Sequence, residues 1–214
     1  MLNIKTFVFN PLQENTYVVS DDSLECVIID CGAFFPEERQ AIVDYIKQEK
    51  LKPVHLLCTH GHFDHNFGID TIFEHFGLQP EIMAGDEFLI GDLPKQFIEM
   101  MGIALNRKYP EVGHYFTKEE VVKFGSHTFT ILPTPGHTPG GVSFYCAQEK
   151  VLFSGDTLFR MSVGRTDFSR SSYSDLVDSL QNVLAPLPSD TTVYCGHGPV
   201  TTIGDELKYN PYMK

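Results

Sequence analysis

Basic residues are scarce in this chain of 214 residues: 16 Lys and Arg stand against 28 Asp and Glu, for a formal net charge of −12. Proteins that bind nucleic acids draw much of their affinity from neutralising phosphates with Lys and Arg. The charge balance therefore argues against a nucleic-acid-binding protein. We expect the partner to be a small molecule, with no nucleic acid bound.

Long apolar runs are also missing. No stretch approaches the ~18 apolar residues that a membrane-spanning helix needs, and residues 1–7 lack the charged start and apolar core of a signal peptide. The five cysteines are an odd number without the spacing of a disulfide framework, which favours a reducing compartment. We expect a cytoplasmic protein that does not bind membranes. Its oligomeric state stays open.

Linker-like segments and internal repeats are absent as well. With 42% hydrophobic and 21% charged residues, the chain can bury a sizeable core and does not have the composition of a disordered protein. Its length fits one large domain. The sequence therefore predicts a single domain over residues 1–214.

Strand-like and helix-like segments alternate in both halves of the chain. Strands are expected at residues 2–9, 16–20, 25–30, 54–58, 121–124, 127–132, 142–146, 151–154 and 192–195. Helices are expected from Pro36 onward, at 66–76 and 172–184, and near the C-terminus. This alternation indicates an α/β or α+β fold in which sheets pack together and helices lie outside.

Residues 85–116 are less regular and rich in Phe and Met. They can form a lid or an acyl-binding pocket, or they can belong to the core or to a subunit interface. The second interpretation is favoured, because large apolar side chains are more often buried than functional.

Potential metal ligands crowd the segment Thr-His-Gly-His-Phe-Asp-His at residues 59–65, directly after an apolar strand. In extended chain His60 and His62 project to the same side. Asp64 and His65 follow where the loop turns into a helix, so they can reach another point in space. Four such residues in six positions can serve two neighbouring ions, and imidazole and carboxylate suit zinc, iron or manganese.

Further candidate ligands follow other apolar strands. His137 lies in Pro-Gly-His-Thr-Pro-Gly, His197 in Cys-Gly-His-Gly-Pro, and Asp156 ends the run Phe-Ser-Gly-Asp. A single histidine is usually structural, but a group of them at several strand ends is typical of a site built on a rigid scaffold. The sequence therefore predicts a metal centre at strand ends.

This pattern resembles the metallo-β-lactamase superfamily, whose signature His-x-His-x-Asp-His matches residues 60–65. The runs Thr-Pro-Gly-His-Thr-Pro-Gly, Ser-Gly-Asp and Gly-His-Gly extend the resemblance over nearly the whole chain. It implies a four-layer αβ/βα sandwich, in which two mixed β-sheets face each other between helices and the metals lie at one edge. It also implies one metal held by His60, His62 and His137, a second held by Asp64, His65 and His197, and Asp156 as the bridge.

Within the superfamily, residues 154–159 and 163–168 resemble the short glyoxalase II-like hydrolases, which are similar to hydroxyacylglutathione hydrolase. Full-length members carry a C-terminal helical domain that binds glutathione, whereas 17 residues follow His197 here. The resemblance thus implies hydrolysis of a thioester of the S-lactoylglutathione type, while the expected lack of that domain leaves the thiol carrier open.

We expect two divalent metal ions, zinc first, with iron or manganese as alternatives. A metal-bridging hydroxide would attack the acyl carbon. Asp64 and Asp156 are the candidate catalytic residues, with Asp64 orienting the nucleophile. Arg165 is one of three arginines in residues 160–170 and can bind an anionic substrate, or it can simply pair with Asp167.

Three other interpretations remain. Iron-dependent persulfide dioxygenases share the Gly-Arg-Thr-Asp-Phe loop found at residues 164–168, but they use a single iron. A lactonase would need the same attack on an acyl carbon. A non-enzymatic, metal-stabilised scaffold is disfavoured, because structural zinc sites are usually closed, four-ligand and rich in cysteine.

Overall fold

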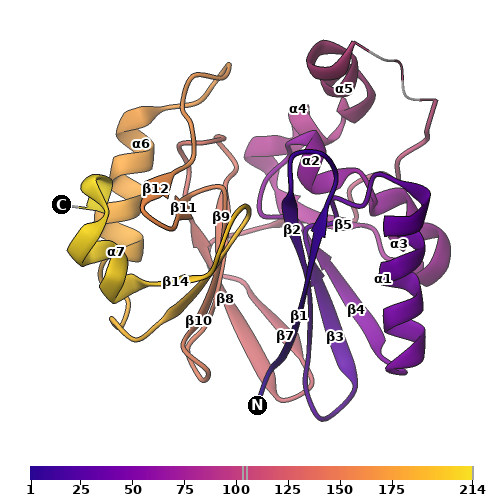
Figure 1. Cartoon of the computed structure of the whole chain (residues 1–214), viewed down its shortest axis with the longest axis horizontal. Helices are drawn as coiled ribbons and strands as arrows, with labels where there is room; N and C mark the ends of the chain where they lie inside the picture. The colour runs from indigo at the N-terminus through magenta and orange to yellow at the C-terminus, as the bar shows by residue number, and fades with distance from the viewer. Residues whose placement is uncertain (103, 105, 214) are drawn as a thin grey trace.

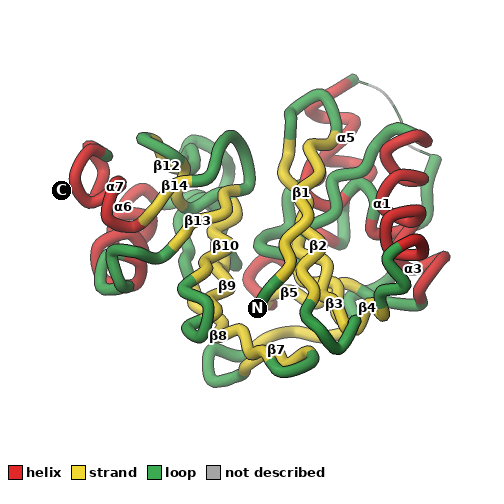
Figure 2. Tube along the Cα trace, turned by 60° about the horizontal axis from the view of Figure 1, so that its bottom comes forward, coloured by secondary structure: helices red, strands yellow, loops and turns green. Residues whose placement is uncertain are grey.

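Two six-stranded β-sheets face each other at the centre of the molecule, and helices cover their outer faces (Figure 1). The computed structural model describes residues 1–102, 104 and 106–213. Figure 2 shows the two sheets as separate groups of strands, with the helices on the sides that face away from the other sheet. This arrangement confirms the predicted metallo-β-lactamase type of sandwich with mixed sheets.

The first sheet is antiparallel from β1 to β3 and parallel from β3 to β6. In spatial order its strands are β1 (Asn3–Phe9), β2 (Glu14–Ser20), β3 (Glu25–Ile29), β4 (Lys52–Leu57), β5 (Pro80–Met83) and β6 (His114–Phe116).

The second sheet is antiparallel except for the pair formed by its strands β10 and β13. Its spatial order is β14 (Thr201–Thr202), β13 (Thr192–Cys195), β10 (Val151–Gly155), β9 (Val142–Cys146), β8 (His127–Pro133) and β7 (Val121–Phe124). A small ribbon of β11 (Leu158–Phe159) and β12 (Ser162–Val163) follows β10.

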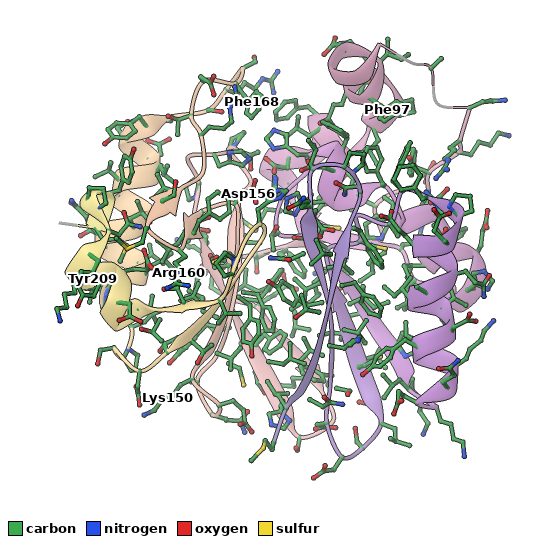
Figure 3. All side chains as sticks on the ribbon, viewed as in Figure 1. Phe97, Lys150, Asp156, Arg160, Phe168 and Tyr209 are labelled. Atoms are coloured by element: carbon green, nitrogen blue, oxygen red, sulfur yellow. The ribbon has the colours of Figure 1, made fainter. Side chains whose placement is uncertain are left out.

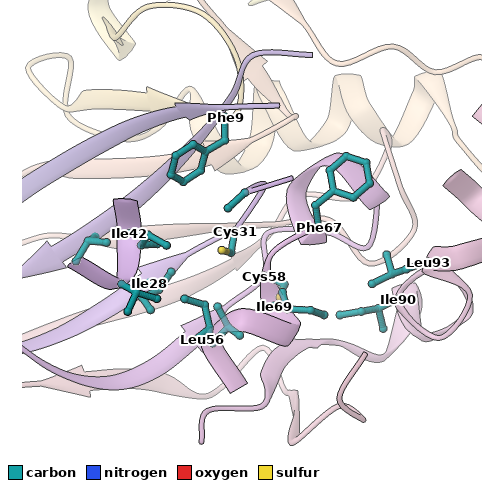
Figure 4. Packing of buried hydrophobic residues seen from close by; sticks show 14 of the residues in the cluster. Phe9, Ile28, Cys31, Ile42, Leu56, Cys58, Phe67, Ile69, Ile90 and Leu93 are labelled. Carbon is teal, nitrogen blue, oxygen red and sulfur yellow. The ribbon is translucent and has the colours of Figure 1, made fainter. Parts of the chain in front are cut away.

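Three layers of buried apolar side chains hold the sandwich together. Between the sheets, Tyr17 and Val19 of β2 meet Phe129, Phe144 and Phe153 of the second sheet. Figure 4 shows the second layer, where the outer face of the first sheet packs against the helices α1 (Pro36–Gln48) and α3 (Ile69–Phe76). The third layer joins the second sheet to α6 (Tyr173–Asp178), the π-helical segment η2 (Ser179–Leu184) and α7 (Ile203–Tyr209), after which η3 (Pro211–Met213) ends the described chain.

The helix predicted at residues 66–76 is interrupted. The structure has a short helix α2 (Phe63–Asn66) and then α3, because the Gly68 N–H donates to the Cys31 carbonyl at 2.8 Å instead of continuing one helix. Helix α3 ends at Gly77, whose φ of 72° few other residues adopt easily. The helix predicted at 172–184 does begin after Ser172, whose hydroxyl accepts from the Asp175 N–H, and its second half widens into η2.

Residues 85–116 contain η1 (Ala84–Asp86), α4 (Glu87–Ile90), α5 (Leu93–Met101) and β6. Phe97 is buried among other phenylalanines and Phe116 lies between the sheets, which confirms a core role for both. Phe88 differs, because it lines a cavity described below. The side chains of Met100 and Met101, which belong to the same expectation, lie outside the described residues.

All five cysteines are buried free thiols. Burial raises the pKa of the Cys195 thiol to about 12, so this group is unreactive at neutral pH. Cys58 and Cys195 come just before ligand loops, yet they pack as small apolar residues, as predicted. Over the described ranges, none of the helices combines the length and apolarity needed to span a bilayer.

A polar cluster joins three turns: the one after β2, the β7–β8 turn and the β9–β10 turn. Oδ2 of Asp21 accepts from the Ser126 N–H at 2.8 Å and lies 2.9 Å from Nδ1 of His127. Nε2 of His127 lies 3.1 Å from a carboxylate oxygen of Glu149. Burial raises the pKa of Asp21, but the hydrogen bonds from Ser23, Ser126 and His127 outweigh it and hold that pKa below its usual range.

We expect Asp21→Asn to lower the free energy of unfolding by about 1–3 kcal/mol at pH 7, because hydrogen bonds to a buried charged group are lost. Folding lowers the pKa of Asp21, so its stabilisation is complete above the unfolded value near ~3.9 and declines as the pH falls through the folded value. Urea unfolding should therefore show a wild-type-to-variant gap in the free energy of unfolding that narrows as the pH falls from 5 to below 4. A gap that widens on acidification would contradict this.

Candidate metal centre

All seven predicted ligands meet at one edge of the sandwich, between the two sheets. His60 and His62 lie in the loop after β4, and Asp64 and His65 in the α2 segment that follows. The others follow strands of the second sheet: His137 after β8, Asp156 after β10 and His197 after β13. Figure 3 labels Asp156, which lies between the two halves of the molecule.

The first cluster contains His60, His62 and His137, whose potential ligand atoms all lie within 4.8 Å of one another. Nδ1 of His62 is 2.9 Å from Nε2 of His137. This grouping is the one that the superfamily resemblance implied.

The second cluster contains Asp64, His65 and His197, again within 4.8 Å. Nε2 of His197 lies 3.2 Å from Nε2 of His65 and 3.3 Å from Oδ2 of Asp64. Asp156 stands between the clusters: its Oδ1 is 3.2 Å from Nε2 of His65, and its Oδ2 is 3.5 Å from Nε2 of His137. The carboxylate is therefore placed where a bridge was predicted.

Outer hydrogen bonds fix which ring nitrogen faces inward. Nδ1 of His65 lies 2.9 Å from Oδ2 of Asp30, Nδ1 of His137 2.8 Å from the Arg165 carbonyl, and Nδ1 of His197 3.0 Å from the Leu12 carbonyl. These oxygens accept, so each Nδ1 carries a proton and Nε2 is the ring nitrogen that faces the centre. Ligation through Nε2 requires the neutral imidazole that carries its proton on Nδ1.

The charges of the two clusters differ. Burial and the neighbouring imidazole of His137 lower the pKa of His62 to about 4, and burial with the nearby His65 and His62 holds the pKa of His60 well below its usual value. Burial also lowers the pKa of His65, but attraction by Asp156 and other carboxylates outweighs it and the net shift is upward. His60 and His62 are thus neutral and ready to ligate, whereas the second cluster attracts positive charge.

The arrangement fits two metal ions. His60 Nε2 is buried and has no hydrogen-bond partner among the described residues. The facing nitrogens of His65 and His197 need a shared proton or a cation between them. A Cβ at Gly196 would lie 2.3 Å from Oδ1 of Asp156, so glycine at this position leaves room for the carboxylate at the centre. Seven nitrogen and oxygen donors of this kind suit zinc, iron or manganese.

Comparison with known proteins decides the family. Residues 9–197 match the family described as the metallo-beta-lactamase superfamily. Hydroxyacylglutathione hydrolase GloC of Haemophilus influenzae is 36% identical over 217 residues, which cover 99% of this chain and 98% of that protein. The chain belongs to the metallo-beta-lactamase superfamily. With its two His/Asp clusters, it is a metal-dependent hydrolase of that superfamily.

Two solved structures are similar to this chain over nearly their full length. The BLEG-1 B3 metallo-beta-lactamase is 36% identical with a TM-score of 0.87, and the alignment covers 99% of this chain and 100% of that one. TTHA1623, in a di-iron-bound form, is 35% identical with a TM-score of 0.85, covering 97% and 99%.

Two carboxylates that sequence reasoning missed organise the ligand loops. Asp30 accepts from the Thr59 N–H and hydroxyl, both at 2.7 Å, in addition to its contact with His65. Asp86 accepts from the N–H of Gly61 at 2.9 Å and of Gly140 at 2.6 Å, so it joins the His60–His62 loop to the loop that carries His137. Asp30 directly follows the apolar strand β3, as other site residues follow their strands, so its position in the sequence could have pointed to it. Asp86 follows no such strand directly, and its position gave no such indication.

Two buried asparagines also fix the ligand loops, because their side-chain amides donate to backbone carbonyls of those loops. Nδ2 of Asn66 donates to the carbonyls of His60 at 3.0 Å and His62 at 2.7 Å. Nδ2 of Asn10 donates to the Asp64 carbonyl at 2.9 Å. Asn10 begins the β1–β2 turn, whose Leu12 carbonyl faces His197, so this turn reaches both sides of the second cluster.

A cavity of about 680 Å³ opens onto the centre. His62, Asp64, His137, Asp156 and His197 form its inner end. Its walls come from α4, α5 and residues 159–169; they include Phe88, Leu89, Lys95, Phe159, Val163, Arg165 and Phe168.

Two roles were predicted for Arg165: binding an anionic substrate and pairing with Asp167. It lines the cavity, and its guanidinium makes two hydrogen bonds of 2.7 Å to the carboxylate of Asp167. The ion pair is therefore present, while binding of an anionic substrate stays a prediction.

We expect Asp86→Ala to weaken metal binding by about 10–100-fold, because Gly61 and Gly140 both lose the carboxylate that fixes their loops. Competition with a chelating dye measures the affinity. Asp44→Ala on the outer helix α1 is the matched control and should bind metal as the wild type does. Wild-type affinity in a folded Asp86→Ala protein would refute this role.

Proposed function

We propose that the chain hydrolyses an acyl thioester of the S-lactoylglutathione type with two divalent metal ions. The observation that carries this proposal is that five of the seven predicted ligand residues form the inner end of a substrate-sized cavity. A molecule in this cavity reaches both clusters, and Asp156 lies between them.

The seven residues have separate tasks. His60, His62 and His137 would hold one ion, Asp64, His65 and His197 the other, and Asp156 would touch both. When bound, such a pair of ions supplies hydroxide near neutral pH and polarises an acyl carbonyl. Asp64 lies at the cavity surface, where its carboxylate can orient the nucleophile. The leaving thiolate, with a pKa near ~8.5, needs no separate acid.

The relatives support the reaction and the metal count. GloC is named a hydroxyacylglutathione hydrolase, which favours a thioester substrate here. TTHA1623 binds two irons, which favours a two-metal centre in this chain and adds weight to iron as an alternative to zinc. The buried free thiols support a reducing compartment, and we place the protein in the cytoplasm.

The persulfide dioxygenase alternative rests on residues 164–168, and the structure offers another reason for that loop. The Arg165 carbonyl accepts from Nδ1 of His137, and the Gly164 N–H donates to the Thr157 carbonyl at 3.3 Å. The motif thus orients a ligand and does not require persulfide chemistry. The complete second cluster likewise favours hydrolysis.

We expect His60→Ala and Asp156→Ala each to reduce turnover of S-D-lactoylglutathione by more than about 1000-fold, because each removes a ligand of a metal centre worth several kcal/mol to the reaction. His75→Ala, on α3 outside the site, is the control and should keep full activity. Circular dichroism checks that the variants fold. Near-normal turnover in either ligand variant would refute the metal mechanism.

Oxygen consumption with glutathione persulfide separates the two enzyme classes. The proposed hydrolase, loaded with iron, should release lactate from S-D-lactoylglutathione and consume no oxygen with the persulfide. Oxygen uptake without thioester hydrolysis would replace the proposal with the dioxygenase.

A further inference from the structure

Arg170 has a backbone conformation that is unusual for its residue type. The Ser171 N–H donates to the Phe168 carbonyl at 3.1 Å, which closes a tight turn over residues 168–171. Arg170 is the third residue of this turn and has a φ of 67°. This left-handed region suits glycine at such a turn position and is strained for an arginine. An arginine held in this conformation points to a use for its side chain.

The turn is anchored to the candidate metal centre on both sides of Arg170. Before it, the ring centre of Phe168 lies 5.1 Å from that of His62 and 5.9 Å from that of His137. After it, the Ser171 hydroxyl donates to the His137 carbonyl at 2.8 Å. The position of Arg170 relative to the metal-ligand candidates is therefore fixed by its neighbours in the chain.

The Arg170 side chain extends from this turn to helix α4, which forms another wall of the cavity. Its guanidinium carbon lies 4.1 Å from the ring centre of Phe88, and Phe88 and Ser169 both line the cavity. Stacking on a ring orients a guanidinium and leaves the N–H groups in its plane free to donate. Arg170 is exposed, and no carboxylate pairs with it among the residues that the structure describes. An oriented cation without a partner thus lies at the rim of the cavity.

The acidic residues of the cavity outside the metal clusters lie on the α5 side. Among the described lining residues they are Asp92 and Glu99, and Lys95 lies between them, 3.4 Å from the first and 3.9 Å from the second. Arg165 and Arg170 belong to the loop on the other side, where Arg165 is bonded to the neighbouring aspartate. A carboxylate that enters the cavity is therefore attracted to the side that carries the two arginines.

We propose that Arg170 binds a carboxylate on the thiol arm of the substrate while the acyl end lies at the metal clusters. The inference rests on the proposed hydrolysis of a thioester of the S-lactoylglutathione type, whose thiol arm carries two carboxylates. A planar guanidinium can donate two parallel hydrogen bonds to one carboxylate. Phe88 is then a positioning residue, because its ring holds the guanidinium at the rim of the cavity.

Kinetics with a charged and an uncharged substrate test this role on the metal-loaded protein. Arg170→Ala should raise the KM for S-D-lactoylglutathione about tenfold and leave kcat within about twofold, because a charged contact made equally in the ground and transition states is lost. With the diethyl ester of S-D-lactoylglutathione, whose carboxylates are masked, the wild type and the variant should have the same KM. Phe88→Leu should raise the KM for the charged substrate more than that for the ester.

Arg160→Ala is the matched control. It removes a cation from the turn between β11 and β12, which is not among the described residues that line the cavity and lies apart from Phe168 (Figure 3). Both KM values should stay at the wild-type level in this variant, because its charge does not reach the proposed contact.

Two more variants separate substrate binding from a structural role. Arg170→Gly suits the left-handed turn position, so it should raise the KM for S-D-lactoylglutathione as Arg170→Ala does, although it removes the backbone strain. Arg170→Lys keeps the charge without the planar guanidinium and should recover only part of the loss. Both variants should bind metal as the wild type does in competition with a chelating dye.

Binding of S-methylglutathione, a thioether that cannot be hydrolysed, supplies a readout that does not depend on turnover. Calorimetry should show about tenfold weaker binding to metal-loaded Arg170→Ala than to the wild type, and no such difference for the diethyl ester. Hydrolysis of S-D-lactoylglutathione with the same KM in the wild type and Arg170→Ala would overturn the inference and leave the proposed function standing. Binding of S-methylglutathione that depends on Arg170, without any thioester hydrolysis, would overturn the proposed function and leave the carboxylate site.

Discussion

Two carboxylates lie between the sheets, Asp64 buried and Asp156 with little exposure, and a charge withdrawn from water is costly unless positive charge compensates it. Their surroundings supply only part of this compensation, because burial and mutual repulsion keep His60 and His62 neutral. Attraction by these carboxylates raises the pKa of His65, which shows how strongly the centre draws a cation. The surrounding residues hold the seven metal-ligand candidates around this negatively charged centre.

The facing sheets supply the required rigidity. Tyr17 and Asn15 of β2, in the first sheet, donate to the Cys195 carbonyl of β13, in the second, at 2.6 and 3.0 Å. They thereby fix the loop that carries His197. Asp86 links the other pair of loops in the same way. These polar contacts between the two halves of the sandwich hold ligands from both sheets at fixed spacing.

The sequence predicted the layers and the ligands for a common physical reason. Strands alternating with amphipathic helices can bury their apolar faces in few ways, and Ile42, Val43 and Ile46 of α1 do so as expected. Strands β8, β10 and β13 run in the same direction, so the histidines and the carboxylate that follow them fall at one edge of the second sheet. The family resemblance divided the ligands into two clusters, and the ligand atoms of His60, His62 and His137 and those of Asp64, His65 and His197 each lie within 4.8 Å of one another.

Other features depend on contacts between distant segments and could not be predicted from local pattern. Asp86 lies 54 residues before Gly140, and Asn10 lies 54 residues before Asp64. The break between α2 and α3 likewise follows from a hydrogen bond of Gly68 to Cys31. Phe88 lines the cavity while Phe97 joins the core, although both have the same residue type in the same segment.

The central claim is that this edge of the sandwich holds two metal ions. Anomalous scattering from crystals of the metal-loaded protein tests it most directly. The account predicts two peaks, one at about 2.0–2.2 Å from His60, His62 and His137 and one at that distance from Asp64, His65 and His197, with Asp156 touching both. A single peak, or peaks away from these residues, would contradict it.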